Sequence, residues 1–307
     1  MLQIHLRRAL LAAALTLPAF VPAAHAEPFS VTHAQGETTL EAVPQTVVVA
    51  DWAAFDNLHA LGVAVAGAPA SAEPPYLSAL VPDDLPRYGS LQEPDVEGIA
   101  AAGPDLVIVA GRSRRAYPTL SPLLPTIDMS VDNADIVGGV KANLAKYGEI
   151  FGVEERAADL AASLDRKIME ARAAAAGKGS ALVVITNAGR LGIYGTRSRV
   201  AWLHDAVGIP PVAETVDDRR DGGDGASFEY LVETNPDWLF VIDRDAAIGR
   251  EGAARATLDN ELIHRTNFWQ RDRIIYLDPA AAYVTMHGYT GLMLLLDQVI
   301  AGYGRAS

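Results

Sequence analysis

The chain has 307 residues, of which 50% are hydrophobic, and this is enough for one large core or two medium ones. It carries 25 Lys and Arg residues against 38 Asp and Glu residues, a formal net charge of −13, which argues against general binding to nucleic acid or anionic lipid. It contains no cysteine, which excludes disulfide bonds and a lipid anchor attached through a cysteine.

The first 26 residues are predicted to be an export signal and not part of the fold. Arg7 and Arg8 form a basic start, an apolar run follows, and Ala24-His25-Ala26 fits the small-x-small rule for cleavage before Glu27. The apolar run is interrupted by prolines and is short for a membrane span, so an uncleaved anchor is less favoured. We therefore expect a soluble exported protein, and the periplasm of a Gram-negative cell is the compartment that suits it.

Residues 47–62 predict a strand followed by a helix. The run VVVAD (47–51) is apolar and suits a buried strand. The helical stretch at 52–61 ends at Gly62, a residue type that commonly terminates helices.

Residues 95–112 contain a pattern that recurs at residues 227–244, without a gap and 132 positions further on. The two segments read DVEGIAAAGPDLVIVAGR and SFEYLVETNPDWLFVIDR. Each begins with a helix N-cap residue type, continues through a short helical stretch to a Pro-Asp turn, and then enters a nearly continuous apolar run. Such a run is typical of a strand of a parallel sheet that is buried on both faces. Each segment ends at an arginine, Arg112 or Arg244.

Residues 154–176 separate the two repeats and predict one long helix. They contain helix formers without Gly or Pro, and Gly177 and Gly179 follow as stop signals. Such a helix spans over ~30 Å, about the width of a lobe. An ordinary surface helix and a rigid strut between two lobes both fit, and the repeat on either side favours the strut.

The second half of the chain repeats the alternation of strand and helix. Strands are predicted at 181–186 and 273–279, and helices at 199–207 and 289–302. We therefore predict an α/β protein of two Rossmann-like lobes with short parallel sheets. The expected boundaries are 1–26 for the signal peptide, 27–153 for the N-terminal lobe, 154–177 for the inter-lobe helix and 178–307 for the C-terminal lobe.

Arginines follow the predicted strands. In open parallel sheets ligands bind beyond the carboxyl ends of the strands, where Arg112 and Arg244 occupy equivalent places, and Arg199 begins a helix after another strand. The same loops also contain Arg114, Arg115, Arg197, Arg219 and Arg220. Guanidinium groups suit planar anions such as carboxylates, phosphates or catecholates. Any single one could be a solvated surface charge, but the matched positions favour a cleft between the lobes.

Signals for a metal site are few. The histidines after residue 26 are scattered, at His33, His59, His204, His264 and His287, so a zinc or manganese site made of protein ligands alone is not expected. Tyr283 and His287 lie four residues apart after the last predicted strand. A tyrosine phenolate suits ferric iron, and an ordinary aromatic residue in the cleft wall fits equally well.

Signatures of common enzymes are missing. The sequence has no G-x-S-x-G elbow, no P-loop and no cysteine nucleophile. The GGDG at 222–225 follows a charged stretch and is interpreted as a loop. We therefore expect a binding protein and not an enzyme.

Taken together, these segments resemble the periplasmic siderophore-binding proteins of iron-uptake ABC transporters, in particular the branch that binds ferric catecholates. The segments that carry the resemblance are VVADWAAFDNLHALGV, EPDVEGIAAAGPDLVIVAGR, SRVAWLHDAVGI, SFEYLVETNPDWLFVIDR and RIIYLDPAAAY. The resemblance implies a monomer of two lobes with a rigid inter-lobe helix, and ferric iron bound only as a siderophore complex. It also implies delivery of that complex to a permease dimer in the inner membrane.

The resemblance further implies a platform of three arginines for the anionic ligand, at Arg112, Arg199 and Arg244, with Arg114 close to the first. Tyr283 matches a tyrosine that completes iron coordination in this branch. The partner histidine is missing, because its loop reads DDRRDGGDGAS with Gly222 near the expected place. Three alternatives stay open: Asp221 or Asp224 replaces it, His287 reaches in, or the ligand is hexadentate and needs no protein donor.

One glutamate in each lobe docks these proteins on their permease, and Glu97 and Glu229 are the matching, repeat-equivalent positions. A glutamate in a first helical turn is also favoured by the helix dipole. The leading hypothesis is a carrier of a ferric siderophore. The alternatives are the same fold binding haem, cobalamin or ferric citrate, and a periplasmic enzyme that acts on metal chelates.

Overall fold

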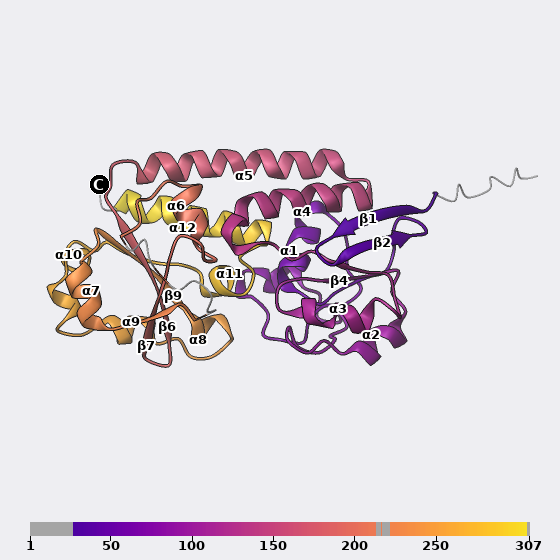
Figure 1. The fold of residues 1–307 in the computed structure, drawn as a ribbon, viewed down its shortest axis with the longest axis horizontal. Coiled ribbons are helices and arrows are strands. Elements are labelled where there is room, and N and C mark those ends of the chain that lie inside the picture. Colours follow the sequence, from indigo (N-terminus) through magenta and orange to yellow (C-terminus); the bar gives the residue numbers. More distant parts are fainter. Residues whose placement is uncertain (1–26, 213–215, 217–221, 306–307) are drawn as a thin grey trace, which may run out of the picture.

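The computed structural model describes residues 27–212, 216 and 222–305, so the predicted export signal lies outside the described residues. Figure 1 shows two lobes side by side along the long axis, each with its own sheet, and helix α5 (Glu154–Ala175) laid across both. The predicted α/β class with two lobes is confirmed. No helix in the part that the structure describes is long and apolar enough to cross a membrane.

The N-terminal lobe is built on a parallel sheet with strand order β3-β4-β5. Its strands are β3 (Val47–Val49), β4 (Leu106–Val109) and β5 (Thr126–Asp128), and an antiparallel hairpin of β1 (Phe29–His33) and β2 (Gly36–Leu40) precedes them. The helices are α1 (Trp52–Leu61), α2 (Val96–Ala102), α3 (Tyr117–Leu120) and α4 (Ile136–Phe151), with short 3-10 turns η1 (Pro75–Leu80), η2 (Ser113–Ala116) and η3 (Asn133–Asp135).

The C-terminal lobe has a five-stranded sheet with the order β10-β9-β6-β7-β8. Its strands are β6 (Ala181–Asn187), β7 (Arg190–Tyr194), β8 (Asp224–Ala226), β9 (Trp238–Asp243) and β10 (Ile274–Tyr276). The helices are α6 (Ala201–Asp205), α7 (Phe228–Thr234), α8 (Arg244–Ala247), α9 (Ala254–Leu258), α10 (Asn267–Gln270), α11 (Pro279–Tyr283) and α12 (Tyr289–Arg305), with the 3-10 turn η4 (Ile263–Arg265). Strands β6, β9 and β10 are parallel, whereas β7 and β8 are antiparallel additions that the sequence did not indicate. Part of the GGDG segment, interpreted as a loop, belongs to β8.

The sequence repeat corresponds to a repeated unit of structure. In both lobes the middle strand of a parallel triplet, β4 or β9, follows a short helix capped by Asp95 or Ser227. The Pro-Asp turns are equivalent too. Asp105 accepts hydrogen bonds from the backbone N–H groups of Gln45 and Thr46, and Asp237 accepts one from Ser180 N–H. Each carboxylate therefore ties the start of the middle strand to the start of its neighbour.

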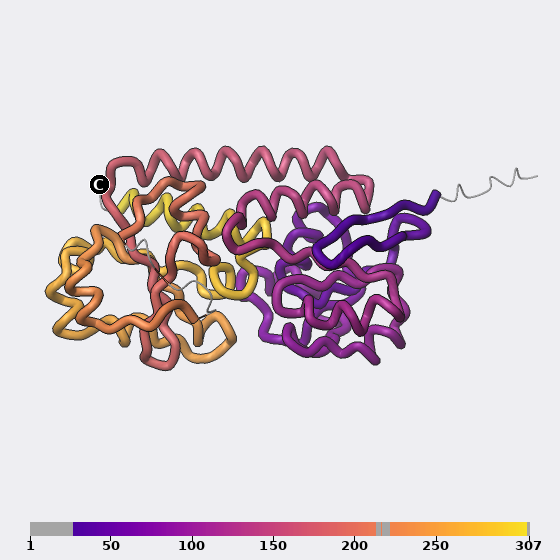
Figure 2. Tube along the Cα trace, viewed as in Figure 1, coloured from indigo at the N-terminus to yellow at the C-terminus, as the bar shows by residue number. Residues whose placement is uncertain are grey.

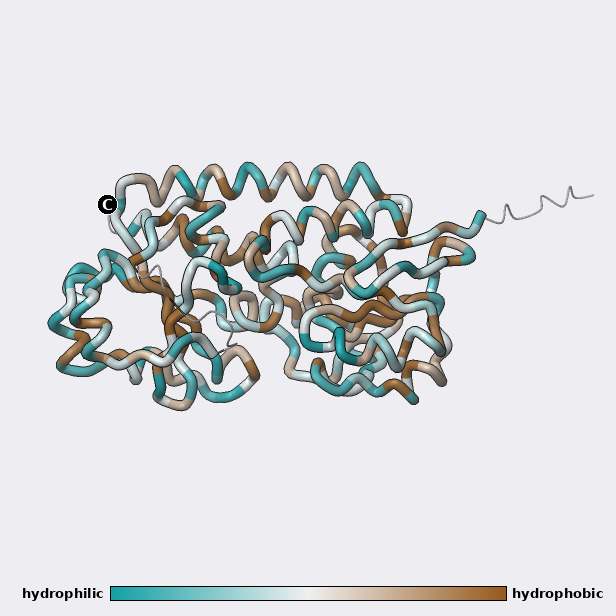
Figure 3. Tube along the Cα trace, viewed as in Figure 1, coloured by the Kyte–Doolittle hydropathy of each residue, from teal (hydrophilic) through white to brown (hydrophobic). Residues whose placement is uncertain are grey.

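The core explains why the middle strands are apolar throughout. In β9, Trp238, Phe240 and Ile242 face the main core, and Leu239 and Val241 face a second cluster on the other side of the sheet. Strand β4 is divided in the same way between the main core and a third cluster. Figure 3 shows these apolar strands in brown within each lobe. The main core contains residues of both sheets, so one continuous apolar core underlies both lobes.

Helices connect the lobes at two places. Helix α5, close to the predicted 154–176 segment, packs against α4 of the N-terminal lobe and α12 of the C-terminal lobe. Figure 2 shows the last, yellow part of the chain running from the middle of the molecule toward its left end, and this helix, α12, packs against α1. Elsewhere the predicted boundaries differ modestly, because α6 and β10 are shorter than expected and α12 extends to Arg305.

Candidate functional site

Three arginines from three segments converge on one tyrosine between the lobes. Arg112 Nη2 and Arg199 Nη1 each donate a hydrogen bond of 3.0 Å to the backbone carbonyl of Tyr283. Arg244 Nε donates to the Tyr283 hydroxyl at 3.1 Å. All three guanidinium carbons also lie 4.8–5.6 Å from the centre of the Tyr283 ring. The structure therefore brings together the four residues that the sequence predicted as one site.

The strand ends deliver these side chains. Arg244 is the first residue of α8, directly after β9, and its Nη1 also donates to the amide oxygen of Asn187 at the end of β6. Arg199 lies two residues before the start of α6, is only 4% exposed and also lies over the ring of Tyr194. Tyr283 ends α11 and is 6% exposed.

Arg112 depends on a sharp turn after β4. Gly111 has φ +50, a conformation that favours glycine, and its N–H donates to the Ser130 hydroxyl that follows β5. The Ser113 hydroxyl accepts from Ala110 N–H and closes the turn. This turn carries Arg112 from the N-terminal lobe to Tyr283 of the C-terminal lobe.

Four guanidinium groups in and beside this cluster lack a carboxylate partner among the described residues. Within the described residues, Arg112, Arg114, Arg115 and Arg244 make no ion pair with a carboxylate. In a chain with a net charge of −13, four neighbouring arginines without a carboxylate partner in the described part of the structure are unusual. Such a cluster creates a positive potential in a cleft and attracts an anionic ligand.

Two pockets lie on either side of Arg112. The polar pocket, about 330 Å³, is lined by residues that include Arg114, Arg115, Ser130, Asn133, Arg199 and His287. The inter-lobe pocket, about 230 Å³, is lined by residues that include Leu91, Arg244, Ile248, Tyr283 and Val284. Arg112 and Gln92 line both. The sequence did not single out Gln92, Ser130 or Asn133, because they belong to no motif.

The segment that follows Tyr283 is held by the N-terminal lobe through a set of hydrogen bonds that we call the α1 clamp. Its members are Asp56 and Asn57 on α1 and Tyr76 in η1. The Asp56 carboxylate accepts from the N–H groups of Thr290 and Gly291, at 3.0 and 2.9 Å, and from the Tyr76 hydroxyl at 3.0 Å.

Asn57 contacts the same segment twice. Its side chain donates to the carbonyl of His287 and accepts from Tyr289 N–H. Burial raises the pKa of Asp56, against the lowering effect of its hydrogen bonds. The clamp fixes the start of α12 and therefore the position of the Tyr283 segment.

The other predicted candidates have different surroundings. His287 is 7% exposed and its Nε2 lies 3.5 Å from Asp51 Oδ1. Asp224 lies in β8, and Arg197 is exposed. Arg219, Arg220 and Asp221 lie outside the described residues. Glu97 and Glu229 are exposed, in the first turns of α2 and α7, which lie toward opposite ends of the molecule (Figure 1).

The remaining histidines lie apart from one another. His204 Nδ1 is 2.8 Å from the carbonyl of Ile209, and His59 stacks on Phe55. His264 pairs with Asp259, and the His33 ring packs against Tyr117. In the described part of the chain, no group of three or more His, Cys, Asp or Glu side chains could hold a metal ion.

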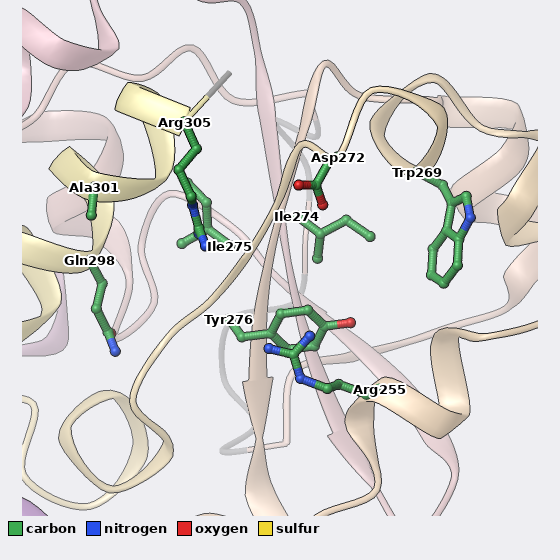
Figure 4. A pocket seen from close by; sticks show the side chains of 9 residues that line it. All are labelled: Arg255, Trp269, Asp272, Ile274, Ile275, Tyr276, Gln298, Ala301 and Arg305. Atoms are coloured by element: carbon green, nitrogen blue, oxygen red, sulfur yellow. The ribbon is translucent and has the colours of Figure 1, made fainter. Parts of the chain in front are cut away.

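A larger cavity, of about 700 Å³, lies elsewhere, beside β10 and the end of α12. Figure 4 shows Arg255, Trp269, Tyr276 and Arg305 around it, and the Arg255 guanidinium stacks on the Tyr276 ring at 3.9 Å. None of the repeat-equivalent arginines lines it. We therefore assign the candidate ligand site to the arginine cluster and not to the larger cavity.

Fold and site together define a two-lobed α/β protein with a positively charged cleft at the carboxyl ends of its strands. A family described as periplasmic binding protein matches residues 47–281, and the chain belongs to this family. The petrobactin-binding protein YclQ of Bacillus subtilis is 33% identical over 262 residues, which cover 84% of this chain and 82% of that protein. Its crystal structure superposes with a TM-score of 0.86 over 91% of this chain and 99% of that one, at 32% identity.

Two further relatives extend the comparison. The ferric-anguibactin-binding protein FatB of Vibrio anguillarum is 30% identical over 283 residues, covering 90% of this chain and 88% of that protein. The structure of the catecholate-siderophore binding protein VctP of Vibrio cholerae has a TM-score of 0.81 at 28% identity, covering 91% of this chain and 100% of that one. The relatives are siderophore-binding proteins of iron uptake, which confirms the predicted resemblance.

Proposed function

We propose that this protein captures a ferric siderophore in the cleft formed by Arg112, Arg199, Arg244 and Tyr283, and delivers it to an ABC transporter. The observation that carries the proposal is the convergence of three arginines on one tyrosine, with no carboxylate paired to Arg112 or Arg244 in the described structure. The family and its siderophore-binding relatives support the same assignment.

A catecholate is the ligand chemistry that suits the cluster best. Ferric catecholates are flat at each chelating group and carry negative charge on their oxygens, so a guanidinium fork can donate to adjacent oxygens. The Arg112 and Arg199 forks now donate to the Tyr283 carbonyl and are close enough to turn toward a ligand in the adjoining pockets. Haem, cobalamin and ferric citrate stay as alternatives for the same cleft.

In this proposal the siderophore supplies all or nearly all of the atoms that coordinate the ferric ion. Tyr283 is the candidate protein donor that we propose in the inter-lobe pocket, and Arg244 Nε donates a hydrogen bond to its hydroxyl oxygen. If the complex bound to a Tyr283→Phe variant keeps its visible charge-transfer band, then every atom that coordinates iron belongs to the siderophore. A changed band would assign one coordination position to Tyr283.

The test of the proposed function is a titration of intrinsic Trp and Tyr fluorescence with a panel of iron compounds. The panel contains ferric petrobactin, ferric enterobactin, ferric anguibactin, ferric citrate and haem. We expect at least one ferric catecholate to quench the protein fluorescence with a sub-micromolar Kd. The reason is that a ferric complex bound at the arginine cluster absorbs light strongly. Absence of binding by every ferric siderophore would refute the proposal, and turnover of a siderophore ester would favour the enzyme alternative.

Delivery to the transporter is proposed to use Glu97 and Glu229. Both are exposed, and hydrogen bonds from its own N–H and from the Ser227 hydroxyl lower the pKa of Glu229, so that carboxylate is charged at neutral pH. Changing both to lysine is expected to reduce uptake of the iron complex at least tenfold in cells or reconstituted vesicles, with ligand affinity unchanged. Unchanged uptake by the double variant would exclude docking through these residues.

The proposed route also includes export. We propose that cleavage before Glu27 releases a soluble monomer into the periplasm, where the carrier meets both the incoming siderophore and the inner-membrane permease. The family to which the chain belongs is one of periplasmic binding proteins, which supports this location.

A further inference from the structure

The cavity beside β10 has no part in the proposed function, because none of the cleft arginines lines it. Its volume of about 700 Å³ is typical of a small-molecule site. Three consecutive residues of β10, Ile274, Ile275 and Tyr276, line it. Successive side chains of a strand point to opposite faces of the sheet, so a cavity that all three line follows the edge of the strand. Strand β10 is the last strand on its side of the sheet, and no described strand covers that edge.

The walls of this cavity are aromatic and its floor is apolar. Trp269 and Tyr276 supply the rings (Figure 4), and Ile275 is buried beneath them. Ile275 packs closely on α12 at Gly302, where a Cβ would lie 2.4 Å from its Cδ1. The His264 ring packs on Trp269 with centroids 4.5 Å apart but does not line the cavity, so it supports the indole from outside. Walls of this kind favour a flat aromatic ring.

Two arginines stand at the rim of the cavity. Figure 4 shows Arg255 of α9 and Arg305 at the end of α12 beside the same lining. The Arg255 guanidinium lies 3.9 Å from the centre of the Tyr276 ring, which holds its flat face and leaves its N–H edge available to an anion. Both arginines are exposed, and neither makes an ion pair with a carboxylate in the described part of the chain. This rim therefore favours a ligand with a carboxylate.

Two further polar groups restrict which anion fits. Gln298 Oε1 accepts from Asp278 N–H, so its amide nitrogen is the group left to donate to a ligand. Asp272 is the only carboxylate among the described residues that line the cavity. The lining thus has two guanidinium groups against one carboxylate, an excess of a single positive charge. A monoanion matches this balance, whereas the second charge of a dianion would be repelled by Asp272.

We propose that the cavity beside β10 is a second ligand site, which binds a planar aromatic monocarboxylate. The ring lies against Trp269 and above Ile275, and the carboxylate at the rim accepts hydrogen bonds from Arg255 and Arg305. This inference is independent of the proposed function, because the two sites share no lining residue. The protein is therefore expected to hold a small aromatic acid and the cleft ligand at the same time.

The test is isothermal titration calorimetry with three probes of one ring system. The probes are 2-naphthoate, the neutral 2-naphthamide and the dianion 2,6-naphthalenedicarboxylate. We expect wild type to bind 2-naphthoate about tenfold more tightly than either of the others, because it alone matches both the aromatic walls and the single excess positive charge.

The charged residues at the rim are tested by two variants at exposed positions. Arg255→Gln/Arg305→Gln is expected to raise the Kd of 2-naphthoate about tenfold and to change that of 2-naphthamide less than about threefold, since only the former loses its cationic partners. Asp272→Asn is expected to lower the Kd of the dianion about tenfold, because the like charge is removed. A purely structural role of Asp272 would not give tighter binding.

Two control variants separate this site from general electrostatics and from the cleft. Arg156→Gln/Arg166→Gln removes two exposed charges of α5 that do not line the cavity. Arg112→Ala disables the cleft. Each should change the Kd of 2-naphthoate less than about threefold. Absence of 2-naphthoate binding by wild type, equal affinity for 2-naphthamide, an unchanged Kd in Arg255→Gln/Arg305→Gln, or loss of binding in Arg112→Ala would overturn the second site and leave the proposed function intact.

Discussion

Replacement of Arg112 by alanine is expected to weaken binding of the ferric ligand by roughly 30-fold to 700-fold, equivalent to about 2–4 kcal/mol. Arg112 lines both pockets and links the lobes by donating to the Tyr283 carbonyl. Its loss removes a cation from the centre of the cleft, and an anionic oxygen of the bound ligand is left without a donor. Fluorescence titration of wild type and variant, at one fixed salt concentration, measures the change.

Two controls separate charge from geometry at this position. Arg112→Lys keeps the positive charge but not the planar fork, so its affinity should lie between those of wild type and Arg112→Ala. Arg166→Ala, on the exposed face of α5, should bind like wild type within a factor of about two. If Arg112→Ala bound the ligand as tightly as Arg166→Ala, the cluster would not be the ligand site.

Replacement of Asp56 by alanine is expected to lower the free energy of unfolding by roughly 2–4 kcal/mol. The residue is fully buried and accepts from the N–H groups of Thr290 and Gly291 and from the Tyr76 hydroxyl. Alanine leaves the two N–H groups without an acceptor, leaves the Tyr76 hydroxyl with Thr285 as its partner, and removes the cap of α12. Urea denaturation measures the loss as a lower midpoint at an unchanged slope.

The matched control for this variant is Asp165→Ala on α5. Asp165 is half exposed and pairs with Lys141, so its loss should change stability by no more than about 0.5 kcal/mol. Equal stability of the Asp56→Ala and Asp165→Ala variants would show that the α1 clamp does not hold the lobes together.

The pH dependence of the Asp56 contribution follows from its raised pKa. Burial raises the folded-state pKa above the ordinary value of 3.8, so the folded state binds the proton more tightly than the unfolded state does. The contribution favours the folded state at low pH and declines as pH rises from the ordinary pKa through the folded one. Asp56→Asn lacks this titration. The stability of wild type relative to Asp56→Asn should therefore fall as pH rises above the ordinary carboxyl pKa, and a rise would contradict the assignment.

Much of the architecture is local in origin and could be predicted. The double-sided burial of β4 and β9 needs continuous apolar runs, and such runs are visible in the sequence. The helix starts at Asp95 and Ser227 are short-range capping patterns. The positions of Arg112 and Arg244 at the strand ends followed from the repeat alone, because equivalent units place equivalent residues at the same edge of each sheet.

The sequence alone therefore determined the two α/β units, the long helix and the matched places of Arg112 and Arg244 at the strand ends, since each depends on short-range periodicity or on the repeat. Only the tertiary structure decided that Arg112, Arg199 and Arg244 share Tyr283, that β7 and β8 extend the second sheet in antiparallel fashion, and that Asp56 caps a helix more than 200 residues further along the chain. The arginine–tyrosine contacts and the Asp56 cap join distant segments through hydrogen bonds that many side chains could make. Which of them form depends on how the shared core positions the lobes, and no local pattern in the sequence records that position.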